Sequence, residues 1–433
     1  MSSLRVSLLR SFVPLAATLA LVGCAGQAPS PGFGGQPAAL GSGFAPGQPA
    51  SAAPGIGKTS GNIALLLPLS GQMAPIGTVL ENAAKLAFPP GATPSLDVRD
   101  TGGTAEGAAA AAQAAIVAGD GIILGPLTSS EAHAVSPIAQ NAGVNMLAFT
   151  NDSTIAAPGV WPLGITPMQQ VQRVVQVAAN AGRTQLAALL PDSDFGHSLG
   201  AALISETSTL GEPNPQITYY QSDFNSLNHA VEQMSDFADR GQSIEAQIKH
   251  ERDLGTAAGR QKAHELQHVQ IPPPSFNALF IGATNGNTLA ELANFLPYYD
   301  VNPPQVQFLG PQMWSSLAPQ MAHQPDLLGA LYAAPDPALA AGFDAKYQTA
   351  YGVAPPAIAD VAFDAAAIAR LAAGSGGYTS SVLTAPAGFS GTDGVLVLQT
   401  TGQVARGLAV FQIAPGAPII TSPAPTQLNQ PNS

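Results

Sequence analysis

The chemistry that residue type and spacing suggest most directly is that of a zinc hydrolase. His264-Glu265-Leu266-Gln267-His268 reads HExxH, and on a helix its two imidazoles share a face, where they can bind zinc while the glutamate acts as general base. Glu291 is a candidate third ligand. However, a triple proline begins at Pro272, and the glycine of the extended zinc-protease motif is missing after His268. We therefore rank a metal-dependent hydrolase third among three hypotheses and predict no metal site.

The only cysteine of the chain, Cys24, lies at the end of a second recognisable pattern. Two arginines precede an apolar run over Phe12–Leu21, as in a secretory signal peptide. Leu21-Val22-Gly23-Cys24 resembles a lipobox, in which the cysteine is acylated and becomes the mature N-terminus. An ordinary signal peptide with a chance cysteine is the alternative. We predict a lipoprotein signal peptide over residues 1–24, with Cys24 as the lipidation site.

Residues 25–60 consist mainly of Gly, Pro, Ala, Ser and Gln, with no charged side chain before Lys58. Such a segment cannot bury a core, so we predict a flexible linker. Ala52–Thr59 loosely fits a phosphate-binding loop, but such a loop needs a strand before it and a helix after it. Ala25, in place of an aspartate after the lipobox, resembles lipoproteins sorted to the outer membrane, so the anchor would attach the chain to that membrane.

Composition argues against several other classes of function. The formal net charge of −12 disfavours nucleic acid as a partner, because phosphate backbones need clustered Lys and Arg. A single cysteine allows neither an internal disulfide nor a cysteine-based zinc site. The sequence contains no glycine-rich dinucleotide turn. We therefore predict a protein that is not an enzyme and needs no cofactor.

The elements that must position any site alternate between strands and helices. Ile63–Leu67 is an unbroken apolar run, as expected of a strand covered on both faces. Further strands are expected at 96–99, 122–124, 145–149, 185–190, 217–220, 278–281, 306–309 and 330–333. The expected helices span 79–88, 104–117, 129–141, 168–181, 195–210, 288–296, 337–351 and 358–373. This order predicts an α/β protein with doubly wound parallel sheets.

Two such series, with strand–helix material returning near the end, predict two lobes joined by three crossings. We assign residues 62–165 and 335–388 to lobe 1, and residues 166–334 and 389–413 to lobe 2. A closing hairpin is expected from segments 394–399 and 404–413. The Pro-rich residues 414–433 are expected to be disordered.

Residues 228–270 differ from their surroundings, because these 43 residues hold 12 of the 42 charged side chains and four of the seven histidines. Apolar residues keep a rough helical spacing. We predict a solvent-exposed insert of two or three helices in lobe 2. It is either a partner-binding surface or a solvated decoration.

Seven motifs, in order along the chain, resemble the type I periplasmic binding-protein fold of the leucine/isoleucine/valine-binding kind. They are IALLLPLSG at 63–71, VRDTGG at 98–103, IILGPLTSS at 122–130, LLPDSDFG at 189–196, FLGPQ at 308–312, YGVAPPAIADVAFDAAAIA at 351–369 and FSGTDG at 389–394. The resemblance covers about residues 62–413 and implies a two-lobed domain with a ligand cleft.

A narrower resemblance is to the penicillin-binding protein activator lipoproteins, the LpoA-like family. FTNDSTIAAPGVWPLG at 149–164 and TPMQQVQRVV at 166–175 look like short alphaproteobacterial-type members of that group. This chain lacks the N-terminal helical-repeat domain of the longer activators. The resemblance implies a peptidoglycan synthase as the partner.

The family's amino-acid binders hold the ligand carboxylate with hydroxyls and backbone amides, and the resemblance places Ser129, Ser130, Thr150 and Asn151 at matching positions. An acidic residue holds the ammonium in those binders, and here its position is taken by Gln312, a poor partner for a buried ammonium. The alternative is that the hydroxyl residues are helix caps and turn residues. Four other side chains could line a different site: Asp152, Asp192, Asp194 and Trp314.

We thus favour a non-catalytic outer-membrane lipoprotein, facing the periplasm, that regulates peptidoglycan synthesis by binding and activating a penicillin-binding protein. The second hypothesis is a solute-binding protein of an ABC importer, for amino acids or another small polar ligand.

Overall fold

The computed structural model describes residues 57–89, 91–269 and 271–428 of the chain. The signal peptide, Cys24 and most of the predicted linker lie outside these residues. The last linker residues are described, and the carbonyl of Lys58 accepts a hydrogen bond from the backbone N–H of Tyr378 (2.7 Å). Among the described residues, no helix combines the length and apolar character needed to cross a bilayer.

The first sheet is fully parallel, and its strand order is β2-β1-β3-β4-β5. These strands span Leu96–Asp100, Ile63–Leu67, Ile122–Leu124, Asn145–Ala148 and Val160–Pro162. The predicted strand at 63–67 is confirmed as β1, and it is paired on both sides. β1 therefore lies inside the sheet.

Strand β1 explains why this sheet needs helices on both faces. Ile63, Leu65 and Leu67 enter one hydrophobic core, while Ala64 and Leu66 enter another, and all five are fully buried. Successive side chains of a strand point to opposite faces, so an unbroken apolar run must be covered twice. Helices α1 (Ala74–Leu86), α11 (Pro337–Tyr351) and α12 (Ala359–Gly374) contribute to the first core. Helices α2 (Ala105–Ala118) and α3 (Ser129–Asn141) cover the second.

The second sheet has the order β15-β14-β10-β9-β8-β6-β7. Its parallel strands are β6 (Leu186–Pro191), β7 (Gln216–Tyr220), β8 (Ala278–Ile281), β9 (Gln307–Gly310) and β10 (Leu331–Ala334). One core contains α6 (Phe224–Ser235), α9 (Gly286–Tyr298) and α10 (Trp314–Met321), and the other contains α4 (Pro167–Asn180) and α5 (Asp194–Leu210). The expected α/β fold with two parallel-sheet lobes is confirmed.

The chain passes between the two large sheets three times, as predicted. The passages lie between β5 and α4, between β10 and α11, and between β13 (Val404–Arg406) and β14 (Ala409–Gln412). The third passage is later than expected. Strands β11 (Phe389–Gly391), β12 (Gly394–Leu398) and β13 form a separate antiparallel sheet. Because Leu396, Leu398 and Val404 are buried in a core of the first sheet, the assignment of residues 389–406 to lobe 2 was wrong.

The C-terminal segment also differs from its prediction. β14 pairs with β10 instead of continuing the expected hairpin, and Ile419–Ser422 form β15, which pairs with β14. The prediction of disorder after residue 413 is therefore wrong for β15. The proline-rich composition concealed a short run of β-branched residues that can add to a sheet edge.

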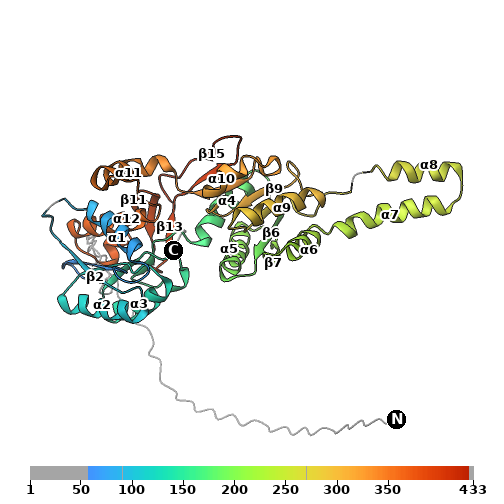
Figure 1. The fold of residues 1–433 in the computed structure, drawn as a ribbon. Helices are drawn as coiled ribbons and strands as arrows, with labels where there is room; N and C mark the ends of the chain where they lie inside the picture. Colours follow the sequence, from blue (N-terminus) through green and yellow to red (C-terminus); the bar gives the residue numbers. More distant parts are fainter. Residues whose placement is uncertain (1–56, 90, 270, 429–433) are drawn as a thin grey trace, which may run out of the picture. The chain divides into compact units, whose positions relative to one another are not determined.

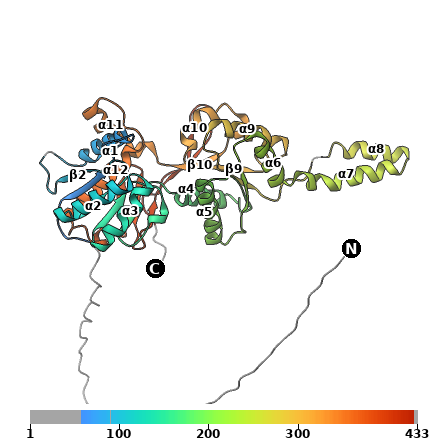
Figure 2. The ribbon, with the colours of Figure 1, turned by 60° about the horizontal axis from the view of Figure 1, so that its bottom comes forward.

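The predicted insert contains three helices, but only two of them are solvent-exposed additions. Leu227, Ala230 and Val231 bury one face of α6 in the core of the second sheet, so α6 belongs to the lobe itself. Helices α7 (Phe237–Asp253) and α8 (Ala257–Leu266) form a hairpin that extends from α6 (Figures 1 and 2). None of the described side chains of α7 is buried.

The two hairpin helices approach closely at Gly259 of α8. A Cβ atom there would lie 2.4 Å from the carbonyl oxygen of Glu251, a distance that requires the helices to separate. At the base, the guanidinium of Arg240 donates to the carbonyls of Pro272 and Tyr299, both at 2.7 Å. Gly259 thus allows the two helices to pack closely near the tip of the hairpin, and Arg240 attaches its base to the lobe.

We predict that Gly259→Ala loosens this hairpin by roughly 1–3 kcal/mol, the usual range for an overpacked contact. The measurement is hydrogen exchange of the α7 and α8 amides, which should speed up while exchange in β1 stays unchanged. Gly241→Ala in α7 is the matched control, because its Cβ would meet only Ile271 Cδ1 at 3.8 Å, and it should slow exchange slightly. Equal exchange in both variants would contradict the close approach.

Candidate functional site

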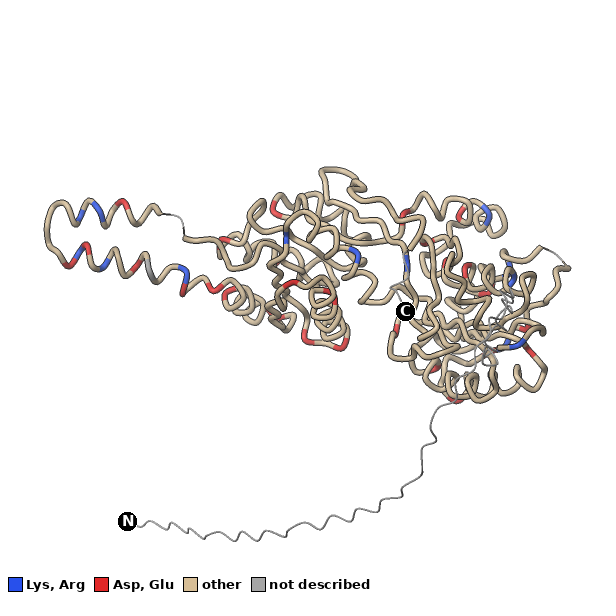
Figure 3. The backbone as a smooth tube through the Cα atoms, turned by 180° about the vertical axis from the view of Figure 1, so that it is seen from behind, with Lys and Arg blue, Asp and Glu red and all other residues tan. Residues whose placement is uncertain are grey.

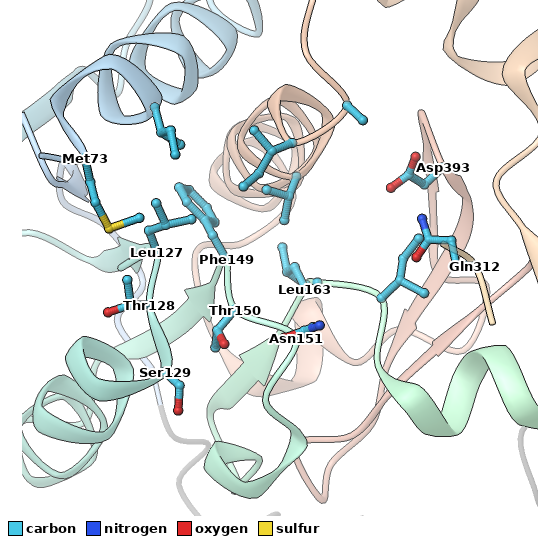
Figure 4. A pocket seen from close by; sticks show the side chains of 16 residues that line it. Met73, Leu127, Thr128, Ser129, Phe149, Thr150, Asn151, Leu163, Gln312 and Asp393 are labelled. Atoms are coloured by element: carbon cyan, nitrogen blue, oxygen red, sulfur yellow. The ribbon is translucent and has the colours of Figure 1, made fainter. Parts of the chain in front are cut away.

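A cavity of about 540 Å³ opens where several strands of the two large sheets reach their carboxyl ends (Figure 4). This edge is where open α/β sheets bind ligands. The loops after β3, β4, β5 and β9 contribute to its wall, together with the start of α12 and the β11–β12 turn. Its lining is Met73, Ile76, Leu127, Thr128, Ser129, Phe149, Thr150, Asn151, Leu163, Gly164, Ile165, Gln312, Ala357, Ile358, Val361 and Asp393. The size falls within the range of small-molecule sites.

Four of the five predicted cleft residues line this single cavity: Ser129, Thr150, Asn151 and Gln312. Ser130 is not in the lining, and its hydroxyl lies 3.2 Å from the hydroxyl of Thr128. That they bind a ligand remains a prediction.

Thr128, and neither serine, caps helix α3. Its hydroxyl accepts from the backbone N–H of Glu131 (3.3 Å), and the Glu131 carboxylate accepts from the backbone N–H of Thr128 (3.0 Å). This is a capping box, in which the side chains of Thr128 and Glu131 each accept the other residue's free backbone N–H. For Ser129 and Ser130 the helix-cap alternative is therefore wrong by one or two residues, because the capping box needs Glu131 three positions after the cap.

Ser129, His133 and Asp152 lie close together, but the Ser129 hydroxyl makes its short hydrogen bond to the carboxylate, while His133 Nδ1 lies 3.4 Å from that hydroxyl. The Ser129 hydroxyl donates to the Asp152 carboxylate, and His133 Nδ1 donates to the Ser129 carbonyl oxygen (3.0 Å). A nucleophilic serine must instead donate to a basic imidazole nitrogen. Burial acts to raise the pKa of Asp152, but bonds from Ser129 and Thr154 outweigh it, and the pKa is lowered. Ser129 therefore sits beside a carboxylate.

Thr150 also makes hydrogen bonds within the protein. Its hydroxyl accepts from the backbone N–H of Asp152 (3.1 Å), and its carbonyl accepts from Gly164 (3.0 Å). A Cβ at Gly164 would lie 2.7 Å from the backbone nitrogen of Asn151, so only glycine permits this approach. The turn-residue interpretation of these hydroxyls gains support, since Ser129 and Thr150 both serve local hydrogen bonds.

Gln312 follows β9, and its backbone N–H donates to the side-chain oxygen of Gln170 (2.9 Å). In Figure 4, Gln312 and Asp393 lie on one side of the cavity, and Met73, Leu127 and Ser129 lie on the other. Asp393 was not predicted. It belongs to the FSGTDG motif at 389–394, but no pattern in the sequence relates that motif to the first sheet.

Asp393 belongs to a group of three aspartates, two of which, Asp393 and Asp364, interact with Arg406. Its carboxylate lies 3.3 Å from Nη1 of Arg406, and Nη2 of Arg406 donates to the carbonyl of Leu163. Asp364, on α12, accepts the backbone N–H of Thr392 at 2.9 Å. Burial raises the pKa of Asp364 to about 6, although Thr392 and Arg406 oppose the increase.

Asp360 lies one turn before Asp364 on α12. Burial raises the pKa of Asp360 far above its usual range, and the nearby carboxylate of Asp393 adds to the increase. Asp364 and Asp344 act in the same direction. Asp393 in the cavity lining and Asp360 outside it therefore cannot both ionise freely.

The other chemical candidates do not form sites. Helix α8 ends at Leu266, so His268 lies beyond it, and the rings of His264 and His268 stand edge to face with centroids 4.9 Å apart. Among residues 57–428, apart from 90 and 270, no three His, Cys, Asp or Glu side chains are placed to hold a metal. Trp314 is fully buried in the core of the second sheet. Asp192 pairs with His197 on the surface (2.9 Å), and Asp194 begins α5.

Comparison with known proteins agrees with this geometry. A family model described as "Periplasmic binding protein" matches residues 61–417. The chain belongs to the periplasmic binding protein family. No curated protein matches the sequence.

Solved structures of this fold include proteins of two kinds. The C-domain of LpoA from Haemophilus influenzae, described as a regulator of PBP1A, is 18% identical with a TM-score of 0.57, and the match covers 83% of this chain and 99% of that one. A putative branched-chain amino acid ABC transporter protein from Rhodospirillum rubrum is 18% identical with a TM-score of 0.62, with the same coverage. Full-length LpoA is 20% identical with a TM-score of 0.59, and the match covers 84% of this chain and 59% of that one. At these identities the likeness concerns the periplasmic binding protein fold alone.

We predict that Asp360→Asn raises thermal stability most at alkaline pH. The unfolded carboxyl ionises near pH 3.8, whereas the folded one holds its proton to higher pH. The stability that Asp360 contributes is therefore complete below the unfolded pKa and is lost as pH rises toward the folded pKa. Asparagine suffers no such loss.

The check is the difference in melting temperature between variant and wild type, measured from about pH 4 to about pH 9. The difference should grow with pH and then level off. Asp326→Asn, at an exposed position in the 3-10 turn Pro325–Leu327, serves as control. A difference that stays constant across this range would refute the raised pKa.

Proposed function

We propose that this protein is a non-catalytic lipoprotein that regulates peptidoglycan synthesis by binding and activating a penicillin-binding protein. Cys24 would carry the lipid, the segment before the folded domain would act as a tether, and the domain would face the periplasm from the outer membrane. The proposal rests on the periplasmic binding protein fold, the motifs at 149–164 and 166–175, and one structural observation.

That observation is the α7–α8 hairpin, which the fold of the lobe does not need. None of the described side chains of α7 is buried, and residues 237–269 hold five of the chain's 15 Lys and Arg residues (Figure 3). The same segment holds five of its 27 acidic residues, so the hairpin is neutral in a chain of net charge −12. A charged projection outside the core is available for contact with another protein, where charge complementarity gives speed and specificity of association.

The second candidate is a solute-binding protein of an ABC importer. The cavity at the carboxyl edges of the strands favours it, as does the fold shared with the Rhodospirillum rubrum protein. The internal hydrogen bonds of Ser129 and Thr150 count against a dedicated carboxylate site. A receptor would bind its solute without needing the hairpin, so the hairpin separates the two candidates.

We predict that the domain stimulates glycan-chain synthesis or crosslinking by a purified bifunctional penicillin-binding protein, and that removal of the hairpin reduces this effect. The variant replaces residues 241–269 with a short Gly-Ser linker and keeps Arg240 at the base. Its melting temperature should stay close to that of wild type, because the deleted side chains contribute little to the lobe core. Full stimulation by the deletion variant would exclude the hairpin, and no stimulation by wild type would exclude the regulator.

We also predict that Cys24→Ala moves the protein from the membrane fraction to the soluble periplasmic fraction, because acylation needs the thiol. Incorporation of labelled palmitate should be lost at the same time. The control is Ser42→Ala in the predicted linker, which should leave both unchanged. A variant that stays in the membrane fraction would argue against lipid anchoring at this residue.

A further inference from the structure

The cavity has an apolar body and a polar wall that carries acidic charge. Phe149, Leu163, Ile358 and Val361 are among the apolar lining, and Asp393 is the one ionisable residue in it. None of the described lining residues is Lys, Arg or His. A ligand that fits this cavity therefore combines apolar surface with a group that a carboxylate can bind.

Of the Asp393–Arg406 ion pair, only the aspartate lines the cavity. The side chain of Arg406 is 2% exposed, whereas that of Asp393 is 13% exposed. Arg406 also divides its guanidinium between Asp393 and the carbonyl of Leu163. Asp364 adds a second carboxyl group beside Arg406, while Asp360 retains its proton, so two acids share one cation next to this wall.

The opposite wall does not favour an anion either. The Ser129 hydroxyl, which could have bound a ligand carboxylate, donates to Asp152 instead. The lowered pKa of Asp152 keeps that carboxylate ionised at neutral pH. An incoming carboxylate would lie close to a fixed like charge, which is unfavourable where water is partly excluded.

We propose that this cavity binds a small organic amine, with its apolar body against Phe149, Leu163 and Ile358 and its ammonium group against Asp393. The ammonium would complete the charge balance that one arginine leaves open, and a charge-assisted hydrogen bond to a carboxylate is among the stronger polar contacts. The proposal goes beyond the regulator function and does not depend on the identity of a protein partner.

Binding of the amine is linked to a proton. The groups that face Asp360 are Asp393 from the β11–β12 turn, Asp364 on its own helix and Asp344 on α11. Arg406, on β13, faces the carboxylate of Asp393. An ammonium beside Asp393 offsets the negative charge that raises the pKa of Asp360. Binding of the amine therefore favours release of the proton from Asp360. Affinity for the amine therefore rises with pH.

The experiment is isothermal titration of the folded domain with three probes that share one apolar body: phenethylamine, phenethyl alcohol and hydrocinnamate. The amine should bind at least about tenfold more tightly than the alcohol, and the carboxylate should bind more weakly than either. Its affinity should increase between about pH 5 and about pH 8. Equal binding of all three probes, tighter binding of the carboxylate, or no binding of the amine at millimolar concentration would overturn the proposal.

Variants assign the effect to the acidic wall. Asp393→Asn should bring the affinity for the amine down to that for the alcohol, while Asp326→Asn, at an exposed position, should change nothing. Asp360→Asn keeps the Asp393–Arg406 pair and should bind the amine with little dependence on pH, so it tests the site even if Asp393→Asn does not fold. An unchanged preference in Asp393→Asn, or an unchanged pH profile in Asp360→Asn, would refute the assignment.

Discussion

The architecture depends on one constraint: an apolar strand such as β1 must bury both of its faces. Alternate side chains of Ile63–Leu67 enter two separate cores. Helices α2 and α3 cover one of them, but α1 alone does not complete the other. Helix α12 supplies the missing cover of one face, although it lies almost 300 residues further along the chain. The chain must therefore leave the first sheet, build the second, and return. The crossings, and the cavity lined by loops of both sheets, follow from that requirement.

The site combines elements that serve structure with a few that remain available for binding. Two hydroxyls that looked suited to a ligand are engaged within the protein. Ser129 donates to the Asp152 carboxylate, and Thr150 accepts a backbone N–H in the turn after β4. The acidic wall is different, because Asp393 and Asp364 share one guanidinium and the neighbouring Asp360 retains a proton that limits their repulsion. Local geometry thus points away from a carboxylate-binding receptor, while the fold it shares with such receptors is intact.

The sequence was sufficient for the fold because each strand of the parallel sheets is a short apolar run followed by a helix with an identifiable start. β1, β3 and β8 have the predicted limits, as do α3 and α11. It was insufficient where the outcome depends on tertiary contacts. The polar composition of residues 228–235 gave no sign of the buried face of α6. The sequence also did not show that β12 packs in the same core as α12, in the first lobe. Asp393 could not be placed at the cavity, since only the folded chain brings the β11–β12 turn to the ends of β4 and β5.

The pairing of β15 with β14 has a consequence for the solubility of the molecule. Without residues 419–422, the antiparallel edge of the second sheet would end at β14, whose Val410 and Phe411 are buried. An uncovered strand of this kind presents unpaired N–H and C=O groups to other chains and promotes edge-to-edge aggregation. β15 makes the edge a four-residue strand flanked by Pro418 and Pro423 instead, and short strands and prolines limit such pairing. A recombinant fragment cut at the end of the family match, at residue 417, would lose this protection.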